Sequence, residues 1–214
     1  MTLMGRLISF YPASILSLAA ALLIWFIFRP SPLHPVALVF VIYLLPPLTL
    51  RLHNLIWPLG EGLMNLAEPK YSAWWGAHQI QLLFIALPQL EAILRLIPGC
   101  YSAWLRLWGS KIGHKIYWTP NIEITDRSMI EVGNRVVFGH KCKLLGHAIK
   151  PKGIVAMLYL RKIKIGSDVF IGAGSRIGPG AVIEDGVYLP ILTDVYVNQV
   201  VDANSAKRAA GSER

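Results

Sequence analysis

The fold is decided by residues 164–195, which read KIGSDV-FIGAGS-RIGPGA-VIEDGV-YLPILT-DV. One aliphatic residue returns at every sixth position of this stretch, and a glycine follows it in the first three units. A period of six does not match the 3.6-residue period of an α-helix, and the density of glycine disfavours helices. The stretch therefore predicts an internal repeat. The repeated positions are Ile165, Ile171, Ile177, Ile183, Leu189 and Val195.

Two shorter runs with the same period precede this stretch. We interpret each unit as one short strand and one tight turn. The aliphatic side chain points inward, and the glycine after it lets the chain turn the corner. A single unit cannot bury its apolar side alone, so the units must stack as coils around a continuous core. The repeated positions of the earlier runs are Ile112, Trp118, Ile124, Val132, Phe138 and Leu144.

The six-residue count breaks twice. The step from Ile124 to Val132 is eight residues, and the step from Leu144 to Ile165 is 21, which is three more than three units of six. A stack of coils accommodates extra residues by extruding a loop at a corner, and loops on rigid scaffolds often carry function. We therefore expect an extruded loop over residues 148–161, directly after His147.

The composition divides the chain into two halves. The 214 residues are 54% hydrophobic and carry a formal net charge of +9, and this hydrophobicity is high for an ordinary soluble enzyme. Residues 1–110 hold six of the seven Trp, whereas residues 111–214 hold 12 of the 18 Gly and 15 of the 21 Lys and Arg. Cys100 and Cys142 are too few for a disulfide scaffold. The pattern indicates a membrane part followed by a water-soluble part.

The segment Leu7–Phe28 predicts a transmembrane helix. It holds 22 residues without a charge between Arg6 and Arg29, and about 20 apolar residues cross the core of a bilayer. The following stretch, Arg29-Pro30-Ser31-Pro32, offers no small-residue cleavage site, so we expect the segment to be retained.

The segment Leu33–Leu50 is interrupted by Pro46-Pro47 near its end. We expect it to cross the membrane as a second helix, and entry and return as a hairpin is the alternative. With two crossings, Arg6 and Arg51 lie on one side and Arg29 on the other. The positive-inside rule then places the N-terminus and everything after Arg51 in the cytoplasm. These residues predict a multi-pass membrane protein whose repeat domain faces the cytoplasm.

These patterns predict four segments: transmembrane helices over 1–56, an interfacial amphipathic segment over 57–110, the repeat domain over 111–201 and a disordered tail over 202–214. In the second segment, Glu91 and Arg95 at i,i+4 suit a solvated helical pair. Aromatic residues in this segment have the spacing of interfacial anchors, and the alternative is that they form core of the second domain. They are Trp74, Trp75, Trp104 and Trp108.

The repeat pattern resembles that of the hexapeptide-repeat acyltransferases, whose signature is an aliphatic residue, a glycine and four further residues. The resemblance implies a left-handed parallel β-helix with three units per coil, or about four coils for twelve units. We therefore predict a mixed fold class, in which N-terminal membrane helices precede this β-helix. Proteins of this superfamily commonly form trimers, so the resemblance also implies a homotrimer.

A second resemblance is local. Three short stretches are similar to the repeat region of membrane proteins related to poly-lysine synthetases. They are Ile122–Asp126, Ile130–Gly133 and Gly146–Lys150. The two resemblances imply a membrane-bound acyltransferase. It would move an acetyl or short acyl group from acyl-CoA, acetyl-CoA above all, to a hydroxyl or amine of a membrane-associated glycan or lipid.

His147 is the general base that the resemblance implies. In the superfamily, a histidine beside such a loop removes a proton from the acceptor as the acceptor attacks a thioester. A neutral imidazole suits that task. Three nearby carboxylates are candidates for accepting the other ring N–H of His147. They are Glu123, Asp126 and Glu131.

His140 and His114 are the rivals of His147. Both stand two residues after a repeated apolar position, so we expect their side chains on a shared face. Three histidines are also the number that a catalytic zinc needs, as in the γ-type carbonic anhydrases of similar fold. The paired-histidine spacing of that family is absent here, so no metal is expected.

Residues 141–164 hold seven cations and no acidic residue. Their positive field suits the phosphates of coenzyme A, and anionic lipid headgroups would be attracted as well. Nucleic acid is not expected, since no recognisable nucleic-acid module accompanies the charge. The alternative to an enzyme is a non-catalytic membrane-tethered scaffold or assembly factor. The candidate donor-binding residues are Lys150, Lys152, Arg161, Lys162 and Lys164.

Overall fold

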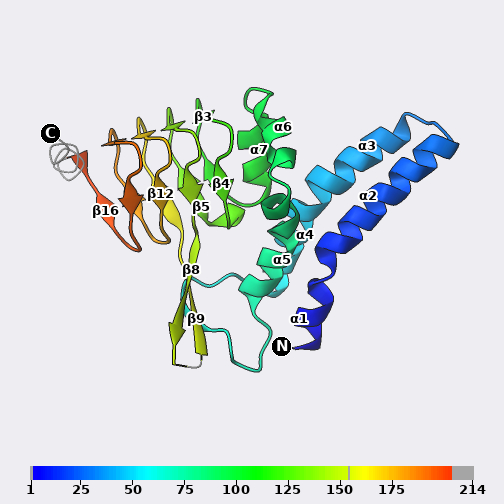
Figure 1. The fold of residues 1–214 in the computed structure, drawn as a ribbon, viewed down its shortest axis with the longest axis horizontal. Helices are drawn as coiled ribbons and strands as arrows, with labels where there is room; N and C mark the ends of the chain where they lie inside the picture. Colours follow the sequence, from blue (N-terminus) through cyan, green and yellow to red (C-terminus); the bar gives the residue numbers. More distant parts are fainter. Residues whose placement is uncertain (1, 154, 204–214) are drawn as a thin grey trace. The chain divides into compact units, whose positions relative to one another are not determined.

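The computed structural model describes residues 2–153 and 155–203 (Figure 1). The chain divides into two compact units: residues 1–59 with 67–83, and residues 60–66 with 84–214. This division differs from the four predicted segments, because residues 57–110 are shared between the two units. Most of the predicted disordered tail, residues 204–214, lies outside the described residues.

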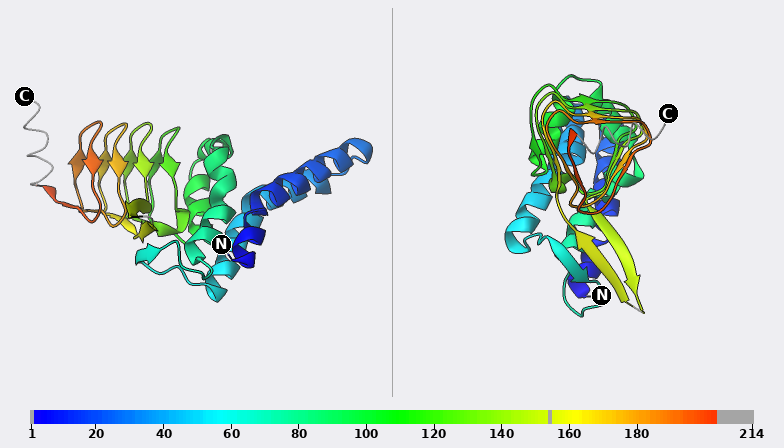
Figure 2. Two further views of the ribbon diagram at one scale, coloured as in Figure 1. Left: turned by 60° about the horizontal axis from the view of Figure 1, so that its bottom comes forward. Right: turned by 90° about the vertical axis from the view of Figure 1, so that its left-hand side faces the viewer.

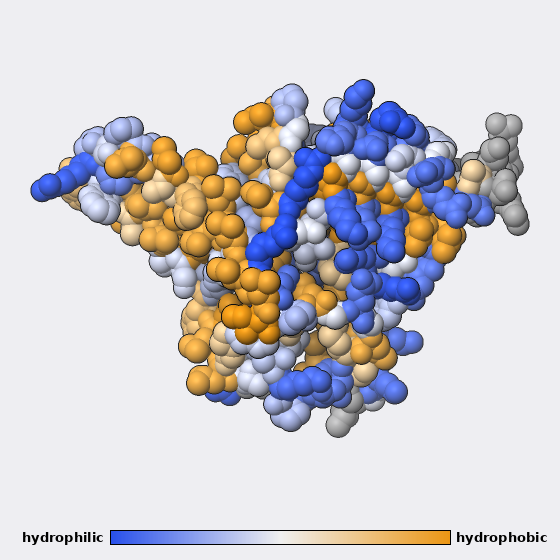
Figure 3. All heavy atoms as spheres, turned by 180° about the vertical axis from the view of Figure 1, so that it is seen from behind, coloured by the Kyte–Doolittle hydropathy of each residue, from blue (hydrophilic) through white to orange (hydrophobic). Residues whose placement is uncertain are grey.

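The first unit is helical. Helices α1 (Leu3–Ile8) and α2 (Tyr11–Phe28) are followed by α3 (Leu33–Val39), the π-helical segment η1 (Phe40–Leu44) and α4 (Leu45–Ile56). Two stretches, Leu3–Phe28 and Leu33–Ile56, are long and apolar enough to cross a membrane. Most of their apolar side chains are exposed, which gives the orange surface over these helices in Figure 3. Such a surface suits helices whose solvent is lipid.

The second apolar stretch continues through Pro46-Pro47 instead of ending there. The π-helical turn directly before the prolines explains this, since the N–H of Leu45 donates to the carbonyl of Phe40, five residues back. Pro46 and Pro47 then stand in the first turn of α4, where a missing N–H costs little. The wider turn therefore lets a single long helix run to Ile56.

The indole rings of Trp74 and Trp75 pack inside the first unit. Helix α5 (Ala73–Ala86) carries both residues. Trp74 is buried, and the Nε1–H of Trp75 lies 3.3 Å from the carbonyl of Gly5 and from Oγ of Ser9. The prediction of interfacial anchors is therefore wrong for Trp74, and Trp75 is tied to α1 within the unit.

The second unit is built around three parallel sheets that the chain visits in rotation. We call them the first sheet (order β16-β13-β10-β5-β2), the second sheet (β14-β11-β6-β3) and the third sheet (β15-β12-β7-β4). Seen along their axis in the right-hand view of Figure 2, the coils superimpose as a triangle. The strands are β2 (Lys111–Ile112), β3 (Tyr117–Trp118), β4 (Glu123–Ile124), β5 (Ile130–Val132), β6 (Val137–Phe138), β7 (Lys143–Leu144), β10 (Ile163–Ile165), β11 (Phe170–Ile171), β12 (Arg176–Ile177), β13 (Val182–Ile183), β14 (Tyr188–Leu189), β15 (Asp194–Val195) and β16 (Val200–Val201).

The interior of the triangle is filled by the repeated side chains. All twelve predicted inward positions are buried, which confirms the six-residue reading of the sequence. Neighbouring coils place equivalent residues in register, as with Trp118 and Phe138, whose rings stack with centroids 4.5 Å apart. Burial of these side chains removes apolar surface from water and is the main force holding the coils together.

The repeat glycines do not turn the corners, contrary to our interpretation of the sequence. The glycine after the inward residue has no positive φ. A Cβ on Gly172 would overlap the backbone of Pro190, and a Cβ on Gly139 would overlap that of Ala173. Glycine is needed there because successive coils touch backbone to backbone. The left-handed residue stands three positions after the inward one, at Lys115, Asn121, Arg135, Lys141, Asp168, Gly174, Gly180, Gly186, Leu192 and Asn198.

The predicted loop over residues 148–161 is a β-hairpin. Strand β8 (His147–Lys152) pairs antiparallel with β9 (Val155–Leu160), and Figure 1 shows the hairpin projecting from the coils. Strand β1 (Gly62–Asn65) pairs with the other side of β9 and completes a three-stranded sheet. Pairing on both sides satisfies the backbone of β9, which an irregular loop would leave to water.

Two helices, α6 (Gln89–Arg95) and α7 (Cys100–Leu107), belong to the same unit as the coils. The indole of Trp118 in the first coil donates to Oγ of Ser102 over 2.8 Å, and Nε of Arg106 donates to the carbonyl of Ile112. Trp104 and Trp108 are buried here. Their prediction as interfacial anchors is therefore wrong, and the alternative of core residues holds for both.

Backbone contact between coils predicts a steric cost at Gly172. Replacing Gly172 with Ala should lower the free energy of unfolding by about 1–3 kcal/mol, the usual cost of overpacking. Unfolding of the detergent-purified chain, followed by circular dichroism, measures this. Gly60→Ala is the matched control, because its Cβ would meet nothing within 4 Å. Equal stability of the Gly172 variant and the parent would contradict close coil stacking.

Candidate functional site

The two breaks in the repeat lie at the same corner of successive coils. Residues 125–129 connect β4 to β5, and residues 145–162 connect β7 to β10, so both connections lead from the third sheet to the first. The coils are in register here, since the N–H of Thr125 donates to the carbonyl of Leu144. Stacking therefore brings Asp126 of one connection beside His147 of the other.

His147 and Asp126 form a short hydrogen bond. Nδ1 of His147 lies 2.6 Å from Oδ2 of Asp126, and the hydroxyl of Thr125 donates to the same oxygen over 2.8 Å. The Asp126 side chain is only 3% exposed, whereas 16% of the His147 side chain reaches solvent. A buried carboxylate thus holds an imidazole that remains accessible.

The pairing fixes the tautomer of the ring. An ionised carboxylate can only accept hydrogen bonds, so Nδ1 of His147 must carry the proton that Asp126 receives. In the neutral ring, Nε2 then holds the lone pair and can take a proton from a substrate. This is the arrangement of a general base with its orienting carboxylate.

Gly146 leaves the room that this pairing needs. A Cβ at residue 146 would lie 2.8 Å from Cβ of Asp126 and 3.1 Å from Cβ of Met129. Its N–H points to the hydroxyl of Thr125 over 3.3 Å. The glycine before the histidine therefore has a steric reason that the sequence alone did not reveal.

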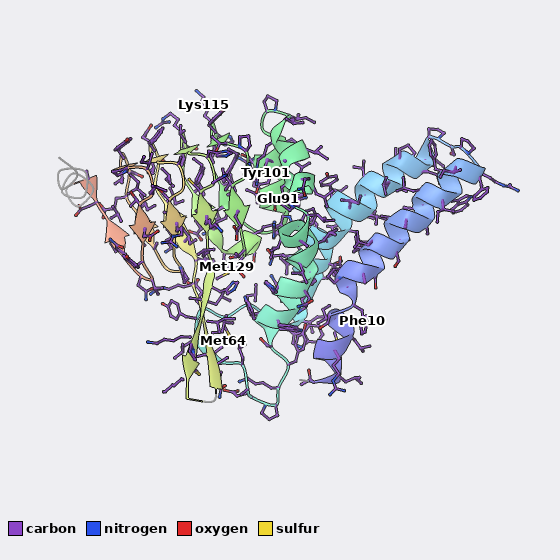
Figure 4. The ribbon with its side chains drawn as sticks, in the orientation of Figure 1. Phe10, Met64, Glu91, Tyr101, Lys115 and Met129 are labelled. Atoms are coloured by element: carbon purple, nitrogen blue, oxygen red, sulfur yellow. The ribbon has the colours of Figure 1, made fainter. Side chains whose placement is uncertain are left out.

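A buried ion cluster holds the chain next to Asp126. The guanidinium of Arg127 pairs with Oε1 of Glu91, and Arg95 and the hydroxyl of Tyr101 both donate to Oε2 over 2.7 Å. Figure 4 labels Glu91 and Tyr101 on α6 and α7. The prediction of a solvated Glu91–Arg95 pair is therefore wrong, because both side chains are buried.

Three aromatic rings lie close to the guanidinium of Arg127 in this cluster. The guanidinium carbon of Arg127 lies 5.5 Å from the ring centroid of Phe84, 5.9 Å from that of Trp104 and 5.8 Å from that of Trp108. Such cation–π contacts favour a desolvated guanidinium. Burial, followed by the charge of Glu91, raises the pKa of Tyr101 well above its ordinary value, so its hydroxyl stays a donor.

The other two predicted carboxylates pair with lysines. Glu123 pairs with Lys143 over 2.7 Å, and Glu131 lies 3.1 Å from Lys111 and 3.5 Å from Lys162. Burial alone would raise the pKa of Glu131, but the two ammonium groups outweigh it and lower the pKa. Both carboxylates precede an inward residue by one position, so strand alternation points them outward. That signal was available in the sequence.

His140 and His114 are exposed and lie at two other corners. His140 follows β6, where the chain passes from the second sheet to the third, and His114 follows β2, where it passes from the first to the second. The expectation of a shared face is therefore wrong. Equal positions within a six-residue unit share a face only when they are a multiple of three units apart.

The predicted donor-binding cations do not form a single cluster. Lys150 and Lys152 are exposed on β8, the strand that begins with His147. Arg161 donates to Oδ1 of Asn198 over 2.8 Å, and Lys162 pairs with Glu131. Lys164 lies in a groove of about 960 Å³ along the first sheet, and neither His147 nor Asp126 lines that groove.

Comparison of the sequence with models of protein families and with curated proteins gave no match. Among solved structures, a hexapeptide-repeat acetyltransferase from Vibrio cholerae complexed with acetyl coenzyme A is 18% identical, covering 54% of this chain and 81% of that chain with a TM-score of 0.32. A maltose O-acetyltransferase from Clostridium difficile is 16% identical over 53% and 77%, with a TM-score of 0.27.

Serine acetyltransferase isoform 3 from Entamoeba histolytica is also similar. It is 14% identical, and the alignment covers 98% of this chain and 76% of that chain with a TM-score of 0.30. At these identities we transfer neither substrates nor residue roles to the present chain. The site rests on its own residues.

The buried cluster predicts a large loss of stability on removal of Glu91. Glu91→Ala should lower the free energy of unfolding by about 3–5 kcal/mol, because it leaves two buried guanidinium groups without their carboxylate. Glu123→Ala is the control, and loss of its half-exposed pair should cost less than about 1 kcal/mol. Denaturant unfolding of both variants in detergent measures the difference. Similar losses would mean that Glu91 does not neutralise the cluster.

Proposed function

We propose that this chain is a membrane-bound acyltransferase, an anchored member of the hexapeptide-repeat acyltransferase superfamily. It would transfer an acetyl or other short acyl group from acyl-CoA to a hydroxyl or amine of a membrane-associated glycan or lipid. The observation that carries the proposal is the Asp126–His147 pair at the corner where the hairpin leaves the coils. Left-handed winding in about four coils, as the repeat resemblance implies, belongs to the same proposal.

The proposed reaction is a direct transfer. Nε2 of His147 takes the proton of the acceptor O–H or N–H while the acceptor atom attacks the thioester carbonyl. A tetrahedral intermediate forms, the carbon–sulfur bond then breaks, and the CoA thiolate receives the proton from the imidazolium. The negative charge of Asp126 stabilises that imidazolium during the step. No net oxidation or hydrolysis is involved.

The site assignment predicts that replacing His147 lowers kcat far more than replacing His140. His147→Ala should lower kcat by about 10²–10⁴ at saturating acyl-CoA, the usual loss of a general base. Asp126→Asn should also lower kcat, because an amide no longer fixes the ring tautomer. His140→Ala is the control and should retain most of the activity. Transfer of a radiolabelled acyl group measures all three.

The reverse result, in which only the His140 variant is inactive, would place the chemistry on another corner. Normal turnover in both histidine variants would refute general-base catalysis by either. Absence of both acyl-CoA binding and transfer in the parent chain would favour the scaffold or assembly factor instead.

We propose that cations after His147 bind the phosphates of the acyl donor. Lys150 and Lys152 share the strand of His147, and Arg161, Lys162 and Lys164 follow the hairpin. A guanidinium or ammonium beside a phosphate forms a charge-assisted hydrogen bond.

Neutralising Lys150 and Lys152 to Gln should therefore raise KM for acyl-CoA and leave kcat nearly unchanged. The effect should shrink as salt rises, because exposed charges are screened over about 8–10 Å. Steady-state kinetics at two salt concentrations measure it. Lys70→Gln is the control, since this exposed lysine belongs to the other unit. A salt-independent loss of kcat would contradict a role in donor binding.

We propose that both apolar stretches cross the membrane and that the repeat domain faces the cytoplasm. The balance of Arg6 and Arg51 against Arg29 supports this orientation.

The homotrimer implied by the repeats is proposed as well, and mass photometry of the detergent-purified chain tests it. Monomers alone would refute the trimer.

The proposed topology predicts one labelled and one protected position. In a chain whose Cys100 and Cys142 are replaced by Ser, a new cysteine at Ser31 should react with an impermeant maleimide in intact cells. A new cysteine at Ser205 should react only after the membrane is opened. Labelling of both positions in intact cells, or of neither, would contradict two crossings.

A further inference from the structure

A second cavity lies at another corner of the β-helix. It has a volume of about 400 Å³ and is bounded by α7 on one side and by the first corner, where β2 passes to β3, on the other. The helical side includes Arg95 and Arg106, and the coil side includes His114, Lys115 and Tyr117. His147 leaves the coils at a different corner, so this cavity is separate from the candidate active site.

The charge lining this cavity is positive. Arg95, Arg106 and Lys115 contribute three cations beside His114, and no Asp or Glu of the described residues lines the cavity. Glu91 is the carboxylate bound to Arg95, but it also pairs with Arg127. Two guanidinium groups against one carboxylate leave an excess positive charge behind the cavity wall, which favours an anion in it.

Arg95 presents a buried donor that no atom of the described residues accepts from. Its Nη2 donates to Glu91, to the hydroxyl of Tyr101 and to the carbonyl of Ile122. Its Nε–H is buried and finds no acceptor among the described residues, although only 5% of the side chain is exposed. A buried N–H without an acceptor is costly, so a ligand oxygen in the adjoining cavity would satisfy it.

The first turn of α7 faces the same cavity. Gly99, Tyr101 and Ser102 line it, and α7 begins without a side-chain cap and without an acidic residue in its first turn. The N–H groups and the positive end of an eight-residue helix therefore add to the field of the arginines. Figure 4 labels Lys115 on the coils and Tyr101 on the helix, the two sides between which the cavity lies.

We propose that this cavity binds a phosphate group carried on an aromatic or apolar body. A phosphate offers enough oxygens to accept from Arg95, Lys115 and the first turn of α7 at once, whereas a carboxylate offers two. The volume exceeds that of the anion alone, and Ile97, Tyr117 and Trp118 give the remaining wall an apolar, aromatic surface.

The proposal does not depend on acyl transfer at His147. A phospholipid headgroup and a soluble phosphate ester share the chemistry that this cavity recognises. The test therefore uses one probe of each kind: dihexanoyl phosphatidic acid for the lipid, and phenyl phosphate for the soluble ester. Dihexanoyl phosphatidylcholine and phenol serve as probes that lack the phosphate monoester.

Isothermal titration calorimetry of the full chain in neutral detergent measures binding of these probes. Lys115→Gln should weaken binding of the phosphate probe by about tenfold, the loss of one charge-assisted hydrogen bond. Lys141→Gln is the matched control, since Lys141 is also an exposed corner lysine with φ of 59° against 56° for Lys115, and it does not line the cavity. The Lys141→Gln variant should bind the phosphate probe as tightly as the parent chain does.

Saturable binding of phenyl phosphate alone would identify a soluble ligand, and binding of phosphatidic acid alone would identify a lipid. Either result supports the site if Lys115→Gln weakens that binding and Lys141→Gln does not. Binding of neither probe would overturn the proposal, as would equal weakening in the Lys141 variant. Loss of binding in the presence of excess CoA would assign the cavity to the acyl donor instead. If the phosphate probe binds but the chain transfers no acyl group, the proposed function is refuted and the phosphate site is not.

Discussion

Backbone contact between successive coils is the constraint on which the second unit depends. Strands of two or three residues pair in register above and below, and the inward residues fill a narrow core. An extra residue inside a strand would turn every later side chain to the wrong face. Additional chain is therefore tolerated at the corners, where it can leave the stack. Both interruptions of the repeat obey this rule.

The candidate site follows from two such additions at one corner. The first supplies Asp126 and turns Arg127 toward α6, and the second begins with Gly146 and His147. Neither addition alone forms the pair, since the histidine belongs to one coil and the carboxylate to the coil before it. The buried pairing of Arg127 with Glu91 ties the residue next to Asp126 to α6.

The helical unit is shaped by its exposed apolar surface and by two prolines in its second long stretch. Its two long apolar stretches expose side chains that would be unfavourable in water and favourable in lipid. Pro46 and Pro47 would be expected to end the second stretch, because neither can donate a backbone hydrogen bond. The π-helical turn before them places both in the first turn of α4, where that donor is not required.

The sequence by itself determined the six-residue period, the twelve inward positions and the two corners at which the chain departs from the coils. These features are local, because they depend on which residue is apolar and on how far apart such residues stand. Strand alternation could also have shown that the side chains of Glu123 and Glu131 point away from the core. The tertiary structure alone decided that Glu91 is buried against Arg127 and that the loop is a hairpin completed by β1. It also decided that the repeat glycines let successive coils touch backbone to backbone rather than turn corners. Each of these depends on atoms brought together from distant parts of the chain, and no local pattern records which distant atoms will meet.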